Sequence, residues 1–98
     1  MDLEILKDML KENLQTKIDL LSKDLKTNDF DSILNVAHQL KGNSGALALG
    51  YNNVNDLGKK LEKIAAKKDL PGIKKIIKEL QTIQKNIRWI NLLLKTES

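Results

Sequence analysis

The sequence contains no cysteine, which excludes a disulfide framework, a thiolate nucleophile and a thiolate metal site. Its single histidine also argues against a structural zinc site, which needs several nitrogen or sulfur ligands. Proline occurs once and aromatic residues make up only 3% of the chain, whereas leucine, isoleucine, lysine and glutamate are abundant. This composition predicts an all-α protein.

No stretch approaches the roughly 18 consecutive apolar residues of a membrane-spanning helix. The N-terminus also lacks a basic segment followed by an apolar run. We therefore expect a cytoplasmic protein with no membrane partner. The net charge of +4, from 17 Lys plus Arg against 13 Asp plus Glu, is modest and spread along the chain. Because a nucleic-acid binder concentrates its basic residues on one face, we expect no nucleic-acid partner either.

Leucine and isoleucine recur at three- and four-residue steps along most of the chain, which is the spacing of one helix face. Short segments rich in Asn, Asp, Gly and Pro interrupt this pattern. The length of 98 residues suits one domain, residues 1–98. The pattern predicts an antiparallel up-down-up-down four-helix bundle, with helices at about residues 2–26, 29–48, 53–68 and 71–95.

The last predicted helix ends in a segment that is apolar on more than one side, residues 89–94. We expect this segment to pack against the first helix. A contact between two copies of the chain is the alternative, although we expect a monomer.

The only histidine, His38, lies in a segment that is unusually rich in glycine. In one continuous helix His38, Lys41, Gly42 and Gly45 would share a strip, because positions i, i+3, i+4 and i+7 lie on one face. A glycine inside a helix costs about 1 kcal/mol relative to alanine, so these two need a reason. Either another helix packs closely on them, or the helix ends near residue 42, or they clear the surface beside the imidazole for a large partner.

The string from His38 to Gly45 reads His-Gln-Leu-Lys-Gly-Asn-Ser-Gly. It is followed by a set of spaced residues: Gly50, Leu57, Leu61 and Glu62. This arrangement resembles histidine-containing phosphotransfer (HPt) domains. Their pattern is His-x-Leu/Ile-Lys-Gly-x-Ser/Ala, then a glycine, then a helix with spaced leucines and a Glu or Gln. The resemblance covers essentially the whole chain and is most specific over residues 36–62.

One position departs from the family's pattern. Family members usually carry a glycine where this chain has Ala48, and here the glycine comes two residues later, at Gly50. An insertion of two residues between Gly45 and Gly50 restores the match of the segment that follows. The insertion leaves open how Glu62 lies relative to His38.

The resemblance implies that the chain is a phosphocarrier. His38 would be the phosphorylation site, accepting a phosphoryl group from an aspartyl phosphate on a receiver domain and passing it to another receiver. Lys41 would balance the charge of the phosphoryl group, and Glu62 would orient the imidazole by accepting the N–H of its inner nitrogen. The residues expected at the partner contact are Gln39, Gly42, Asn43 and Gly45.

The resemblance also implies the partners, which would be receiver domains of response regulators or of hybrid histidine kinases. The sequence has neither a glycine-rich phosphate loop nor clustered carboxylates for magnesium. We therefore expect no ATP site, no metal site and no cofactor in this chain, with Mg²⁺ supplied by the partner receiver domain. In these terms the protein is not an enzyme.

Three other interpretations stay open. The chain could be a helical adaptor, or a degenerate HPt-like module, that binds a partner without being phosphorylated. It could be the phosphotransfer segment of a larger histidine kinase, against which the initial methionine and the absence of a linker count weakly. An enzyme using His38 as a general base is the least supported, because no second catalytic group has a readable spacing.

Overall fold

The computed structural model describes residues 3–97, and the side chains of residues 3–87. Every element in this range is a helix: α1 (Leu3–Lys26), α2 (Phe30–Lys41), α3 (Ser44–Ala48), α4 (Asn52–Ala66) and α5 (Leu70–Glu97). The all-α prediction is therefore confirmed. The predicted helix start at Asp2 and the side chains of the apolar segment 89–94 lie outside the described residues. Within the part of the chain that is described, no helix is both long and apolar enough to cross a membrane.

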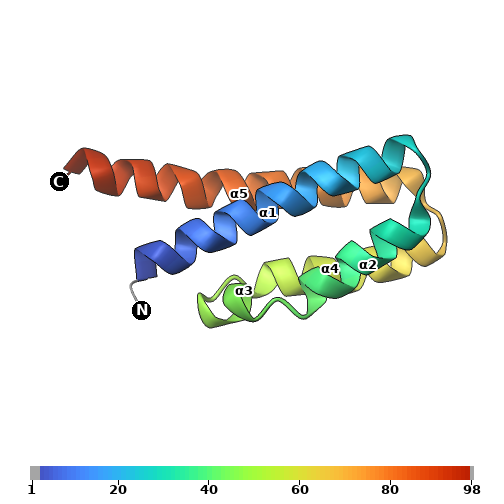
Figure 1. The fold of residues 1–98 in the computed structure, drawn as a ribbon, viewed down its shortest axis with the longest axis horizontal. Coiled ribbons are helices and arrows are strands. Elements are labelled where there is room, and N and C mark those ends of the chain that lie inside the picture. The colour runs from blue at the N-terminus through green and yellow to red at the C-terminus, as the bar shows by residue number, and fades with distance from the viewer. Residues whose placement is uncertain (1–2, 98) are drawn as a thin grey trace.

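The four longer helices pack around one another in a ring. α1 contacts α5 and α2, and α4 contacts α2 and α5. Figure 1 shows the chain running along α1, turning back through α2 and α3, running out again along α4 and returning along α5. α1 and α5 are longer than α2 and α4, so the shorter pair lies beside only part of the longer pair (Figure 1). The α1/α5 side of the molecule is thus opposite the α2/α4 side.

The core is built from the helix faces that the periodicity predicts. Each longer helix contributes apolar side chains that are almost fully buried: Leu10, Leu14, Ile18 and Leu21 from α1; Ile33, Val36, Ala37 and Leu40 from α2; Val54, Leu57, Leu61 and Ala65 from α4; and Ile73, Ile76, Ile77, Leu80 and Ile87 from α5. Burying one large apolar side chain stabilises the fold by roughly 1.5–3 kcal/mol. This burial explains why α2 forms here, since an isolated helix of its 12 residues would be marginal in water.

The predicted helix over residues 29–48 is wrong in one respect, because it is interrupted. α2 ends at Lys41 with Gly42 as its C-cap, and α3 begins at Ser44. The Asn43 side chain caps α3 by accepting a hydrogen bond from the Ala46 N–H at 3.0 Å. The same side chain donates to Asn13 Oδ1 of α1 at 3.2 Å. The apolar spacing continues through this break, so periodicity alone does not reveal it.

The short α3 ends in a turn that favours glycine. Gly50 has a φ of +83°, in the left-handed region. The Tyr51 N–H donates to the Ala46 carbonyl at 2.8 Å, and the Gly50 N–H donates to the Leu47 carbonyl at 3.2 Å. These two bonds satisfy carbonyls at the helix C-terminus in the Schellman arrangement. Gly50 therefore serves the turn between α3 and α4, in the segment where two extra residues are inferred.

Candidate functional site

His38 lies in the last turn of α2, and its side chain is exposed. Its neighbours on the buried face, Ala37 and Leu40, are both 0% exposed, so the histidine points away from the core. The His38 carbonyl accepts a hydrogen bond from the Gly42 N–H at 3.1 Å. No hydrogen bond or ion pair within the described residues engages the imidazole itself. The exposed imidazole is therefore available to another molecule.

Lys41 lies one turn beyond His38 and forms an ion pair across the helix interface. Its Nζ atom is 3.4 Å from Glu62 Oε1 on α4, with 45% of the lysine side chain and 31% of the glutamate side chain exposed. Glu62 Oε1 is itself buried and accepts no hydrogen bond within the described chain. The structure thus brings Glu62 to Lys41, and no hydrogen bond joins it to His38. The role of Glu62 in orienting the imidazole stays a prediction.

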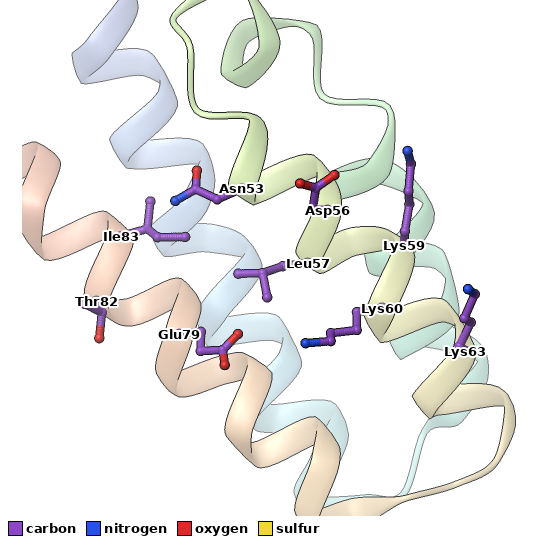
Figure 2. A pocket seen from close by; sticks show the side chains of 9 residues that line it. All are labelled: Asn53, Asp56, Leu57, Lys59, Lys60, Lys63, Glu79, Thr82 and Ile83. Atoms are coloured by element: carbon purple, nitrogen blue, oxygen red, sulfur yellow. The ribbon is translucent and has the colours of Figure 1, made fainter.

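Two further lysines, Lys59 and Lys63, surround this ion pair. Together with Lys41 and Glu62 they line a hollow of about 300 Å³ between α2 and α4. Figure 2 shows both side chains on the side of α4 that faces away from α5, whereas Lys60 reaches toward α5. Three cations around one carboxylate make this hollow positive, which favours an anionic group or an acidic partner surface. Sequence reasoning missed this hollow: spacing places Lys59, Glu62 and Lys63 on one face of α4, but only the packing of α4 on α2 brings Lys41 to them.

Gly58 explains how closely α4 approaches the turn that carries His38. A Cβ atom at Gly58 would lie only 2.3 Å from the Lys41 nitrogen and 2.9 Å from the Ala37 carbonyl oxygen. Both are main-chain atoms of α2, so no side-chain movement could make room. The absence of a side chain at Gly58 is therefore what allows α4 to pack this closely on α2. By fixing the distance between the two helices, Gly58 places Lys41 within reach of Glu62.

Asn55, a buried polar residue of α4, holds the end of α2. Its side-chain amide donates to the carbonyls of Leu40 at 3.2 Å, Lys41 at 3.2 Å and Asn43 at 3.0 Å. The Leu40 and Lys41 carbonyls lie in the last turn of α2, where partners within the helix run out, and the Asn43 carbonyl lies just beyond it. Asn55 thus fixes the backbone directly after His38. The spacing of the sequence does not predict these bonds, because they depend on how α4 packs against the end of α2.

Gly42 and Gly45 have no comparable packing role. A Cβ at Gly42 would meet its nearest atom, the His38 carbonyl oxygen, at 3.6 Å, and one at Gly45 would meet Asn43 Oδ1 at 3.4 Å. Neither glycine has a positive φ. The interpretation that another helix packs closely on them is wrong, and the helix does end near residue 42. Gly45 belongs to α3, so it does not continue the helical strip of His38, Lys41 and Gly42.

Two other residues are expected at a partner contact: one of them is exposed, and the side chain of the other takes part in the fold. Gln39 is exposed beside His38. Asn43 is half-buried and already bonded to Ala46 and to Asn13. Contact of either residue with a partner stays a prediction, and for Asn43 it would have to coexist with its capping role.

A protein-family model of the Hpt domain matches residues 5–88, which is most of the chain. The chain therefore belongs to the Hpt domain family. Members of this family are phosphocarriers rather than enzymes, act in phosphotransfer in phosphorelays and typically interact with receiver domains. No curated protein and no solved structure matches the chain.

Proposed function

We propose that the chain is a histidine phosphocarrier of a two-component phosphorelay. His38 accepts a phosphoryl group from the aspartyl phosphate of one receiver domain and passes it to another receiver. The observation that carries this proposal is the exposed His38 side chain, one turn before Lys41, in a chain of the Hpt family. The proposal takes residues 1–98 as one domain, a monomeric and cytoplasmic antiparallel up-down-up-down bundle.

The transfer forms one bond and breaks one. A histidine is mostly neutral near pH 7, so one ring nitrogen carries a lone pair. On His38 this lone pair attacks the phosphorus of the aspartyl phosphate, and the aspartate carboxylate leaves with the electron pair of the broken P–O bond. The phosphohistidine keeps its proton on the other ring nitrogen. The receiver supplies Mg²⁺ and the acidic pocket, and a second receiver aspartate takes the phosphoryl group by the reverse step.

The basic residues beside His38 support this chemistry. A phosphoryl group brings close to two negative charges at pH 7. Lys41 is one turn away and only partly neutralised by Glu62, and Lys59 and Lys63 add positive charge to the same hollow. Glu62 would accept the inner N–H of the imidazole after a change of rotamer that separates it from Lys41.

The Lys41–Glu62 ion pair also gives the alternative its one specific support. With Glu62 engaged by Lys41, no group of the described chain fixes the tautomer of His38. A helical adaptor that binds a receiver without being phosphorylated would tolerate this arrangement. The two functions differ in one observable, the covalent label on the protein.

Labelling from a receiver domain that carries radioactive aspartyl phosphate tests the proposal. We expect acid-labile, base-stable label on the wild-type chain and none on His38→Gln, whose amide cannot act as the nucleophile. Circular dichroism should show equal helicity and equal unfolding, because the side chain is exposed. An unlabelled wild type across a panel of active receivers, with the bundle intact, would favour the adaptor.

Reversing the charge of Lys59 and Lys63 is expected to slow phosphotransfer by about tenfold at low salt, because opposite charges accelerate association. The wild-type rate should fall with added salt and the rate of the double Lys→Glu variant should not, since salt screens exposed charges. Stopped-flow measurement of kcat/KM at several ionic strengths checks this. The matched control is Lys74→Glu with Lys78→Glu on α5, which should leave the rate unchanged.

Filling the space at Gly42 is expected to obstruct the receiver and not the fold. Gly42→Leu should lower the phosphotransfer rate by about tenfold or more, since a small misplacement of reacting groups is enough for such a loss. The free energy of unfolding should change by less than about 1 kcal/mol, the scale of an exposed substitution. A normal transfer rate in this variant would show that the surface beside His38 need not be clear.

A further inference from the structure

A second groove lies on the side of the bundle opposite the α2/α4 hollow. α1 and α5 enclose a hollow of about 580 Å³ there, between the end of α1 and the beginning of α5. Its apolar residues are Leu25, Leu70 and Ile77, and its cations are Lys26, Lys74 and Lys78. No carboxylate is among the described residues that line it. The groove is therefore basic with an apolar floor, and the phosphotransfer chemistry proposed above does not use it.

We propose that this groove is a second docking surface, which binds an acidic amphipathic helix of a partner protein. Charge complementarity selects acidic residues, because three exposed lysines edge the groove without a counter-charge in its lining. The apolar floor selects leucine-like side chains between those acids. Its α5 edge, residues 70–81, would extend about 16 Å at helical rise, which matches about three turns of a docked helix.

The depth of the floor distinguishes a helix from flatter partners. Ile77 is only 7% exposed and Leu25 is half-buried, whereas the lysines around them are exposed. A bilayer surface would meet the lysines and Leu70 first and would not reach Ile77. Nucleic-acid phosphates would pair with the lysines and leave the apolar floor uncovered. A single helix can insert one row of apolar side chains between two helices and still present acids to both edges.

The position of the groove would let a docked partner and a receiver bind the chain at the same time. α1 and α5 form one side of the ring of helices, and the hollow lined by Lys41, one turn from His38, lies between α2 and α4. A partner helix bound to α1 and α5 would therefore leave the His38 side open to a receiver. Such a tether would raise the effective concentration of a receiver carried by the same partner. The docking itself does not depend on phosphorylation of His38.

The test titrates the full chain, labelled with ¹⁵N, with a synthetic helix-stabilised peptide of three to four turns. The peptide carries leucines at positions i, i+3, i+4 and i+7 and glutamates elsewhere. We expect a Kd below about 100 µM, with amide shift changes concentrated at Leu25, Leu70 and Ile77. Lys74→Glu with Lys78→Glu should weaken binding by at least about tenfold. Lys59→Glu with Lys63→Glu, the same charge change on the opposite side, should leave binding unchanged.

Four results would overturn the inference. These are no binding at millimolar peptide, equal binding of a scrambled peptide whose leucines share no face, shift changes located beside His38, and an unchanged Kd in the Lys74→Glu, Lys78→Glu variant. Preferential binding to phosphatidylglycerol vesicles or to duplex DNA, with the same dependence on Lys74 and Lys78, would reassign the groove. The His38 labelling experiment is unaffected by any of these results, so a failure of the second surface and a failure of the phosphocarrier function are distinguishable.

Discussion

Gly58→Ala is expected to lower the free energy of unfolding by about 3 kcal/mol, because the added methyl group meets the main chain of α2. The Cβ would lie 2.3 Å from the Lys41 nitrogen, which is far inside van der Waals contact. Relief requires α4 to move away from α2, and that movement separates residues of the core. On an exposed helix the same substitution would raise stability by about 1 kcal/mol, so the two situations differ in sign as well as in size.

Urea denaturation followed by circular dichroism measures the effect of Gly58→Ala. Gly42→Ala is the matched control, because its Cβ would find only ordinary contacts and its φ is negative. We expect the control to stay within about 0.5 kcal/mol of the wild type. If Gly58→Ala is as stable as the wild type, α2 and α4 do not approach as closely as described, and the account of the site's geometry is wrong.

Asn55→Asp is expected to lower the free energy of unfolding by about 3 kcal/mol at pH 7, the scale of a buried charge without a partner. The amide of Asn55 donates to three carbonyl oxygens at the end of α2. A carboxylate of the same shape donates nothing and faces these oxygens at the negative end of the helix dipole. The substitution therefore replaces hydrogen bonds by repulsion with almost no change of volume.

The loss in Asn55→Asp should depend on pH in a defined direction. Burial and the surrounding carbonyls raise the pKa of the introduced carboxyl above its value in the unfolded chain. The folded state therefore binds the proton more tightly, and stability relative to the wild type falls as the pH rises through the unfolded and then the folded pKa. Lowering the pH toward about 4 should reduce the difference in free energy of unfolding between Asn55→Asp and the wild type, because a protonated carboxyl can donate a hydrogen bond again.

Asn53→Asp is the control for this prediction. Asn53 is exposed in the first turn of α4, and its side-chain oxygen accepts from the Val54 N–H, as a carboxylate also can. A negative charge near a helix N-terminus stabilises by a few tenths of a kcal/mol to about 1 kcal/mol. We expect no loss of stability in this variant at pH 7. If Asn53→Asp and Asn55→Asp lower the free energy of unfolding equally, the hydrogen bonds of Asn55 do not hold the end of α2.

The long helices and their buried faces could be predicted from the sequence, because apolar residues at helical spacing are the same residues that pack. Leu14, Leu40, Leu61 and Leu80 are each 0% exposed, and each stands in such a series. The break at Gly42 could not be read in this way. The apolar spacing continues past Leu40 to Leu47, although Leu47 is 61% exposed in the structure. The end of α2 depends on hydrogen bonds from Asn55, twelve residues or more away in the chain.

For the site, the sequence indicated which residues share a helix and not which residues meet across helices. The spacing places His38 and Lys41 one turn apart on one helix. The pairing of Lys41 with Glu62 depends on how α4 is rotated against α2, which no single-helix pattern contains. The same holds for Lys59 and Lys63, which become site residues only once the two helices pack.

The central claim is that His38 both accepts and donates a phosphoryl group. A complete relay in one vessel tests it most directly: a phosphorylated first receiver, this chain, and a second receiver that the first cannot phosphorylate, with the label followed over time. We predict that label passes transiently through the wild-type chain and accumulates on the second receiver. With His38→Gln in place of the wild type, the label should not reach the second receiver. Equal arrival of label at the second receiver with His38→Gln, or label held on the chain at another residue, would contradict the account.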